Sequence, residues 1–160
     1  MIDFLIEMSK PVDQSTRRPS ALGLRLTPDS TIETTSPPWL RAIEKRVNVL
    51  LNLHDNWDGE GAPRISYECV MAAFGLVLTN VTHETPAPHF VPTSQGGIQA
   101  EWHLGGTDLE LIFDPTEPAR YYYAGLDGVE IEGLVGDDPS LVRALMRALP
   151  TRNDIAQPTR

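Results

Sequence analysis

The sequence predicts an α+β domain: two N-terminal helices, a four- to five-stranded antiparallel sheet of hairpins and one C-terminal helix, with the helices packed on one sheet face. Two observations predict it. Residues 38–81 show helical periodicity, whereas residues 89–134 alternate with a period of two and are divided by Gly-Gly and Asp-Gly turns. With 160 residues and 41% hydrophobic content, the chain is long enough for one such domain with a core.

Three segments are expected along the chain. Residues 1–37, rich in Pro, Ser and Thr, predict an N-terminal arm, in which only Ala21–Leu26 (ALGLRL) alternates well enough for a short edge strand. Residues 38–150 form the single domain, and residues 151–160 a flexible tail. The N-terminus has no signal-peptide pattern and no apolar run approaches a membrane span, so we expect a cytoplasmic protein.

The first helix is expected after Ser36-Pro37-Pro38, where Ser36 is the predicted cap and the prolines suit a first turn. Its apolar positions recur at helical spacing: Leu40, Ile43, Val47, Leu50 and Leu51. His54 ends this stripe and is more typical of a boundary histidine than of a ligand.

Asn56–Pro63 (NWDGEGAP) predicts a loop after this helix. It lacks the lysine of a P-loop, and its acids would repel phosphate. Calcium binding by Asp55, Asp58 and Glu60 is conceivable, but the EF-hand spacing is absent. We interpret the loop as structural, with Trp57 filling a gap between helices.

Two further helices are expected. Ser66 caps a nearly all-apolar helix over about Tyr67–Val81, which predicts the most buried helix of the domain. Asp137-Asp138-Pro139 begins the last helix, and Pro150 ends it.

The most informative stretch is Gly96–Asp114, in which two alternating runs flank Gly105-Gly106. A two-residue Gly-Gly loop fixes the register of a hairpin. Glu101 is then predicted to face Glu110, and His103 to face Asp108. Like charges directly opposite each other are unfavourable, which makes this pair unusual.

A second hairpin is expected over Ala119–Gly125 and Val129–Leu134, with Asp127-Gly128 as a two-residue type I′ turn. This register places Tyr123 opposite Glu132 and Ala124 opposite Ile131. The residues predicted to share its outer face are Tyr121, Tyr123, Glu130 and Glu132. Preceding both hairpins, His89–Pro92 predicts a short edge strand.

Charge and cysteine content exclude several classes of function. The net charge of −9 argues against direct binding of a nucleic-acid backbone and favours a basic partner or a cation. The only cysteine, Cys69, excludes an internal disulfide and a cysteine-based zinc site, and its apolar neighbours predict an inert buried thiol. We expect no cofactor and no resident metal.

The predicted outer sheet face has three interpretations. It could be an ordinary solvated surface. It could bind a partner, for which the predicted residues are Glu101, His103, Asp108, Glu110, Tyr121, Tyr123, Glu130 and Glu132. It could also hold a metal or a carboxylate acid/base pair, although a flat face neither excludes water nor positions a substrate.

The stretches NWDGEGAP and GGIQAEWH (residues 96–103) resemble a pattern found in short bacterial proteins of unassigned function, over roughly residues 40–133. The resemblance implies a bacterial or phage origin and a shared fold, and it carries no catalytic residues. The matching positions of such a pattern would be Trp57, Asp58, Glu101 and Trp102.

These observations favour a non-enzymatic interaction protein that binds a basic protein, such as a nucleic-acid-handling protein or a toxin, as accessory subunit or inhibitor. The alternative is a small metal-dependent hydrolase using Glu101, His103 and Asp108. A third hypothesis assigns binding to the N-terminal arm. A homo-oligomer is left open.

Overall fold

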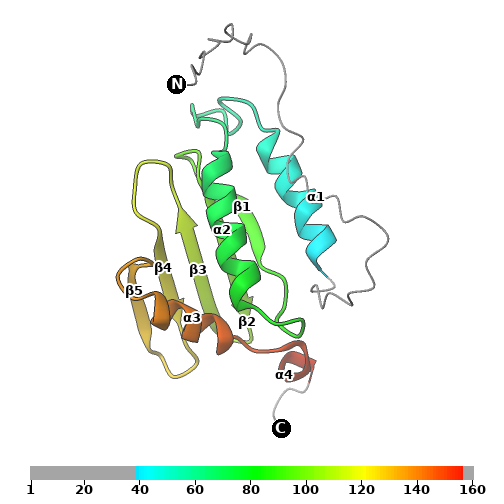
Figure 1. Cartoon of the computed structure of the whole chain (residues 1–160), viewed down its shortest axis with the longest axis vertical. Helices are drawn as coiled ribbons and strands as arrows, with labels where there is room; N and C mark the ends of the chain where they lie inside the picture. The colour runs from blue at the N-terminus through cyan, green and yellow to red at the C-terminus, as the bar shows by residue number, and fades with distance from the viewer. Residues whose placement is uncertain (1–38, 157–160) are drawn as a thin grey trace, which may run out of the picture.

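One antiparallel sheet and four helices make up residues 39–156, the part of the chain described by this computed structural model (Figure 1). The strands follow chain order across the sheet, β1-β2-β3-β4-β5. The elements are α1 Leu40–Leu51, α2 Tyr67–Asn80, β1 His89–Pro92, β2 Ile98–Leu104, β3 Thr107–Phe113, β4 Arg120–Ala124, β5 Glu130–Leu134, α3 Pro139–Arg147 and α4 Arg152–Ala156. The predicted α+β class is confirmed. The predicted arm over residues 1–37 lies outside the described residues.

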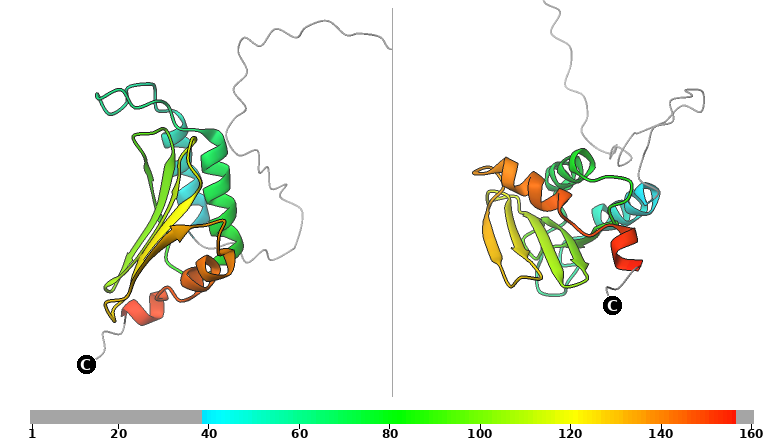
Figure 2. Two further views of the ribbon diagram at one scale, coloured as in Figure 1. Left: turned by 90° about the vertical axis from the view of Figure 1, so that its left-hand side faces the viewer. Right: turned by 90° about the horizontal axis from the view of Figure 1, so that it is seen from below.

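Helices α1, α2 and α3 lie on one side of the sheet (Figure 2). α2 crosses the middle of the sheet over β2 and β3, α1 packs against β1, and α3 packs against α2. No described helix or strand covers the opposite side of the sheet (Figure 2). The domain therefore has an inner face that carries the core and an outer face that remains open among residues 39–156.

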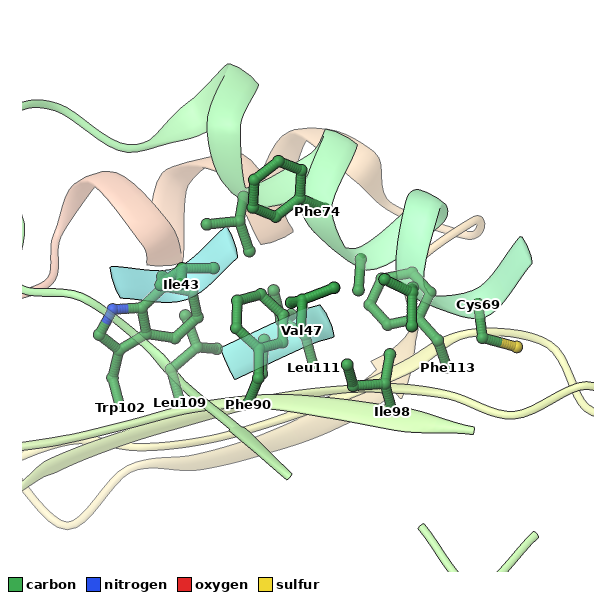
Figure 3. Packing of buried hydrophobic residues seen from close by; sticks show 14 of the residues in the cluster. Ile43, Val47, Cys69, Phe74, Phe90, Ile98, Trp102, Leu109, Leu111 and Phe113 are labelled. Atoms are coloured by element: carbon green, nitrogen blue, oxygen red, sulfur yellow. The ribbon is translucent and has the colours of Figure 1, made fainter. Parts of the chain in front are cut away.

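The core forms where alternating strand residues meet the apolar faces of α1 and α2 (Figure 3). Trp102 is the largest fully buried side chain, and its indole Nε1 donates a hydrogen bond of 3.0 Å to the carbonyl of Pro86. This bond satisfies the polar atom that burial would otherwise leave unpaired. Other members of the core seen in Figure 3 are Ile43, Val47, Phe74, Phe90, Ile98, Leu109, Leu111 and Phe113.

The helix starts agree only in part with the sequence. Ser66 caps α2 as predicted, because its side chain accepts a hydrogen bond from Cys69 N at 3.2 Å. Asp138 caps α3 in the same way, accepting from Leu141 N at 2.9 Å. At α1, the cap position is Trp39, which makes no side-chain capping bond; the predicted cap Ser36 lies outside the described residues.

After Pro150 the sequence predicted only a tail, whereas residues Arg152–Ala156 form the short helix α4. Asp154 accepts hydrogen bonds from the backbone N and Oγ1 of Thr151 at 2.8 and 2.7 Å. Arg152 N donates to the carbonyl of Glu84 at 3.1 Å, which connects α4 to the loop between α2 and β1. These local bonds are not visible in a periodicity search because the helix has barely one turn.

The β2–β3 hairpin has the predicted register. Glu101 pairs with Glu110 and His103 with Asp108. Gly105 and Gly106 both adopt positive φ, at 58° and 91°, as a two-residue loop of this kind requires.

The register predicted for the β4–β5 hairpin is wrong by one residue. Tyr123 pairs with Ile131 and Ala124 with Glu130, whereas the two-residue turn predicted Glu132 and Ile131 as their partners. Gly125 N donates to Val129 O at 2.9 Å, and Gly128 N donates to Gly125 O at 3.0 Å. Only Gly128 has positive φ in this turn, so the loop contains three residues and ends in a glycine bulge.

The shift exchanges the faces of β4, because side chains alternate across a strand. Tyr121 and Tyr123, predicted on the outer face, lie on the inner face, where Tyr121 is buried and Tyr123 is half-buried against the core. Tyr122 takes the outer position. Tyr121 lies against Gly133 of β5, where an added Cβ would stand 3.0 Å from the tyrosine hydroxyl.

Candidate functional site

The outer face of the sheet gathers most of the residues that the sequence nominated. Strand pairing fixes its members from all five strands: His89, Val91, Gln99, Glu101, His103, Asp108, Glu110, Ile112, Arg120, Tyr122, Ala124, Glu130, Glu132 and Leu134. Of the eight predicted partner-binding residues, six lie on this face. The exceptions are Tyr121 and Tyr123, for the reason given above.

One row of residues runs straight across the sheet through all five strands. In order it contains His89, Glu101, Glu110, Tyr122 and Glu132. Facing side chains on neighbouring strands have Cβ atoms about 4.5–5.5 Å apart, so Glu101 and Glu110 hold two carboxylates at close range. The row therefore concentrates negative charge at the middle of the face, with Tyr122 between Glu110 and Glu132.

Glu101 is the better accommodated of the two facing glutamates. Gln99 Nε2 donates a hydrogen bond of 3.0 Å to Glu101 Oε2, and His103 Nε2 lies 3.8 Å from the same oxygen. Only 19% of the Glu101 side chain is exposed. In contrast, within residues 39–156, neither Glu110 nor Glu132 forms a hydrogen bond or ion pair through its side chain, so no cationic group is bonded to either carboxylate.

His103 is held by carboxylates on both sides of its ring. Its Nδ1 lies 2.8 Å from Asp108 Oδ1, while Nε2 faces Glu101. The hydrogen bond to Asp108 raises the pKa of His103, with further contributions from the charges of Glu101 and Glu110; partial desolvation opposes them. The histidine thus acts as a titratable counter-ion within the acidic face.

Among residues 39–156, Arg120 is the only arginine or lysine on the outer face, and its charge is neutralised by neighbouring acids. Its guanidinium lies 3.1 Å from Asp114 Oδ2 and 3.7 Å from Glu117 Oε2. Asp114 is buried and also accepts a hydrogen bond from Thr93 Oγ1. Arg120 consequently neutralises the end of the β3–β4 connection and leaves the five outer-face carboxylates in excess.

A shallow depression of about 420 Å³ opens on the β4–β5 side of this face. Ile112 and Leu134 supply apolar surface, while Glu132 and the ring of Tyr122 stand beside it. Arg120 also lines the depression, but Asp114 and Glu117 pair with its guanidinium. The apolar wall and the Glu132 carboxylate therefore suit the stem and charged head of a lysine or arginine.

Tyr122 and His89 are members of the face that the sequence did not nominate. The incorrect β4–β5 register put Tyr122 on the inner face of β4. It also placed Glu132 opposite Tyr123, whereas Glu132 pairs with Tyr122. Partial desolvation and the neighbouring Glu130 raise the pKa of Tyr122, which keeps its hydroxyl protonated and able to donate. His89 was read only as part of an edge strand, although the pairing of β1 with β2 places it opposite Glu101.

The Asn56–Pro63 loop directs its polar groups inward, to its own backbone. Asp58 Oδ1 accepts hydrogen bonds from Glu60 N and Ala62 N at 2.8 and 3.1 Å, and these bonds lower the pKa of Asp58. Asn56 Oδ1 accepts from Gly61 N at 2.7 Å. Trp57 is half-buried and its indole donates to Pro63 O at 3.2 Å. These bonds support the interpretation of the loop as structural.

The four positions matching the resemblance do not form one site, but the two stretches that carry it do touch. Trp102 points into the core and Glu101 to the outer face, so these two neighbours lie on opposite faces of the sheet. The contact is made by Gly96: its carbonyl accepts a hydrogen bond of 2.7 Å from Ser66 N, and a Cβ there would collide with Pro63. The two stretches that carry the resemblance therefore meet at a packing junction in this chain.

Three further features concern the chemistry and the environment of the molecule. Among residues 39–156, no group of three or more His, Cys, Asp or Glu side chains is arranged to hold a metal ion. Cys69 is buried, as predicted, beside a pocket of about 360 Å³ at the start of α2. Within the same residues, no helix is both long and apolar enough to cross a membrane.

Comparison with protein-family models, curated proteins and solved structures finds no match for this chain.

Proposed function

We propose that the protein is a non-enzymatic binding protein that uses its outer sheet face to bind a basic protein partner, as an accessory subunit or an inhibitor does. The observation that carries this proposal is the unbalanced charge of a face that no described element covers. Within residues 39–156, five carboxylates lie on this face, and its one arginine is engaged with Asp114 and Glu117.

The chemistry of the face indicates what it would bind. The carboxylates of Glu110 and Glu132 attract a basic surface and speed its encounter, and the overall charge of −9 acts in the same direction. The same field repels nucleic-acid phosphates. Tyr122 and the adjacent depression offer rigid, partly apolar contact area, which a patch of charge alone would lack.

The test is charge reversal of Glu101, Glu110 and Glu132 to lysine. A matched control reverses three acids outside the sheet, Glu44 of α1 and the loop residues Glu60 and Glu84, and so changes the net charge equally. A tagged protein is first used to recover a partner from its native cells, and the affinity of the purified pair is then measured by calorimetry.

We expect the control to bind like the wild type and the face variant to bind at least about 100-fold more weakly, or about 2.7 kcal/mol, because like charges across an interface are strongly unfavourable. Since Glu101 accepts the Gln99 hydrogen bond, a double variant at Glu110 and Glu132 guards against misfolding. Equal affinity of face variant and wild type for a purified partner would refute the proposal, as would equal losses in face variant and control.

A further inference from the structure

β5 is the last strand at one edge of the sheet, and some of its backbone groups point away from the other strands (Figure 1). In the β4–β5 ladder, Gly125 N bonds Val129 O and Val135 N bonds Ala119 O. Bonded and non-bonded positions alternate along an antiparallel strand, so every second residue of β5 directs its N–H and C=O outward. These outward groups belong to Glu130, Glu132 and Leu134.

The two edges of the sheet differ in how far the described chain covers them. At the β1 edge, α1 packs beside the strand, and Arg46 Nε donates a hydrogen bond of 3.2 Å to the carbonyl of Phe90. At the β5 edge, Asp137 N donates to Leu134 O at 3.2 Å. The remaining outward groups of β5 have no hydrogen bond within residues 39–156, and such an edge is a template for an added strand.

The two faces of the sheet differ in chemistry at this edge. On the inner face, Ile131 and Val135 are half-buried and pack against the core, so the core reaches the edge without being fully covered there. On the outer face, Glu130 and Glu132 are exposed, and Glu132 stands at the depression that Leu134 lines. An added strand places alternate side chains on the two faces. It gains most from apolar residues next to Ile131 and from lysine or arginine next to the glutamates.

We propose that the β5 edge binds an extended segment of the basic partner, in which lysine or arginine alternates with apolar residues, as an added strand of the sheet. This inference rests on the proposed function and specifies how the partner binds. Hydrogen bonds to the outward backbone groups of β5 give the segment its affinity. The alternation gives specificity, because it directs the cations to Glu130 and Glu132 and the apolar side chains to Ile131.

Charge favours this occupant over a second copy of β5. The strand Glu130–Leu134 (EIEGL) contains two glutamates and no lysine or arginine. A second β5 therefore brings further carboxylates to an edge that already carries them, and it offers no cation to either glutamate. A segment that alternates basic and apolar residues supplies that cation, so we assign the edge to a partner.

The experiment is an NMR titration of the isotope-labelled full chain with the peptide GKVKVKVKG, blocked at both ends. The control peptide GKKVVVKKG has the same composition and charge but does not alternate. Two substitutions isolate the backbone contribution: Glu132→Pro removes the carboxylate and the outward N–H, whereas Glu132→Gln removes the carboxylate alone. Because this N–H does not bond β4, proline is compatible with the edge position.

We expect the alternating peptide to shift the amide signals of β5 and to protect the Glu130 and Glu132 amides from hydrogen exchange. The control peptide should bind the wild type at least about tenfold more weakly. Glu132→Pro should bind the alternating peptide about tenfold more weakly than Glu132→Gln, the loss expected for one backbone hydrogen bond. Circular dichroism verifies the fold of both variants, and the comparison of the two peptides needs no variant.

Several results would overturn the proposal. Equal affinity of the wild type for the two peptides would do so, as would equal affinity of the two folded variants or no binding of the alternating peptide. Protection of the Glu130 and Glu132 amides without peptide would also do so, because the edge is then already occupied: by a second copy if the protection depends on protein concentration, and within the chain if it does not. The proposed function fails separately, if lysines at Glu101, Glu110 and Glu132 leave the affinity for a purified partner unchanged.

Discussion

Substitution of Gly97 tests how closely the start of β2 packs against the end of β3. Its φ is not positive, so the need for glycine at this position is steric. A Cβ on Gly97 would lie 2.1 Å from the carbonyl oxygen of Phe113 and 2.3 Å from Asp114 Oδ1. Both distances are far below van der Waals contact, and the first involves backbone. Gly97→Ala therefore forces the start of β2 away from the end of β3.

The size of the effect follows from what must move. Overpacking of this kind costs about 1–3 kcal/mol. The displacement also disturbs the hydrogen bond of 2.9 Å from Gly97 N to Thr93 Oγ1, whose loss adds about 1 kcal/mol. We expect Gly97→Ala to lower the free energy of unfolding by about 3 kcal/mol, within the range of severe single substitutions.

Gly75 is the matched control, because the same substitution should have the opposite sign there. It lies on the exposed side of α2, and an added Cβ meets nothing within 4 Å. Gly75→Ala should raise the free energy of unfolding by about 0.5–1 kcal/mol through helix propensity. Urea unfolding followed by circular dichroism measures both. A Gly97→Ala variant within about 1 kcal/mol of the wild type would refute the steric reasoning, as would equal destabilisation by both substitutions.

Two further predictions test the corrected register and the acidic face. Tyr121→Ala should lower the free energy of unfolding by about 3 kcal/mol, because Tyr121 is buried. Tyr122→Ala should lower it by under about 1 kcal/mol, because Tyr122 lies on the outer face. Urea unfolding measures both, and the reverse order would support the register predicted from the sequence. The raised pKa of His103 means that its pairing with Asp108 and Glu101 stabilises the fold fully below the unfolded-state pKa of about 6.5 and ceases to do so as the pH rises through the folded-state pKa. The difference in unfolding free energy between wild type and His103→Gln should therefore shrink as the pH increases; a difference that is constant or grows with pH contradicts this assignment.

Local chemistry was sufficient wherever one residue type restricts the backbone. Gly105-Gly106 can adopt the two positive φ angles of a tight loop, so the β2–β3 pairing and the Glu101/Glu110 contact could be read from the chain. Ser66 and Asp138 offer side-chain oxygens to free amides at helix starts, which located α2 and α3.

The contact between residues 56–63 and residues 96–103 could not be predicted from local chemistry. No local pattern marks Gly96 and Gly97 as packing positions, yet they are where the loop before α2 meets the start of β2 and the end of β3. Their close approach depends on three segments that are separate in sequence. Buried Asp114, shared by Thr93 and Arg120, is likewise a product of that meeting.

The sequence by itself determined the α+β class, the helix starts at Ser66 and Asp138, and the first hairpin, because each depends on interactions within a few residues. Only the tertiary structure decided the face of each β4 side chain. Asp127-Gly128 is compatible with a two- or a three-residue loop, and a difference of one residue exchanges the inner and outer faces of β4. The choice rests on distant partners: Tyr121 lies against Gly133 and the core beneath α2 and α3, while Tyr122 faces solvent beside Glu110 and Glu132.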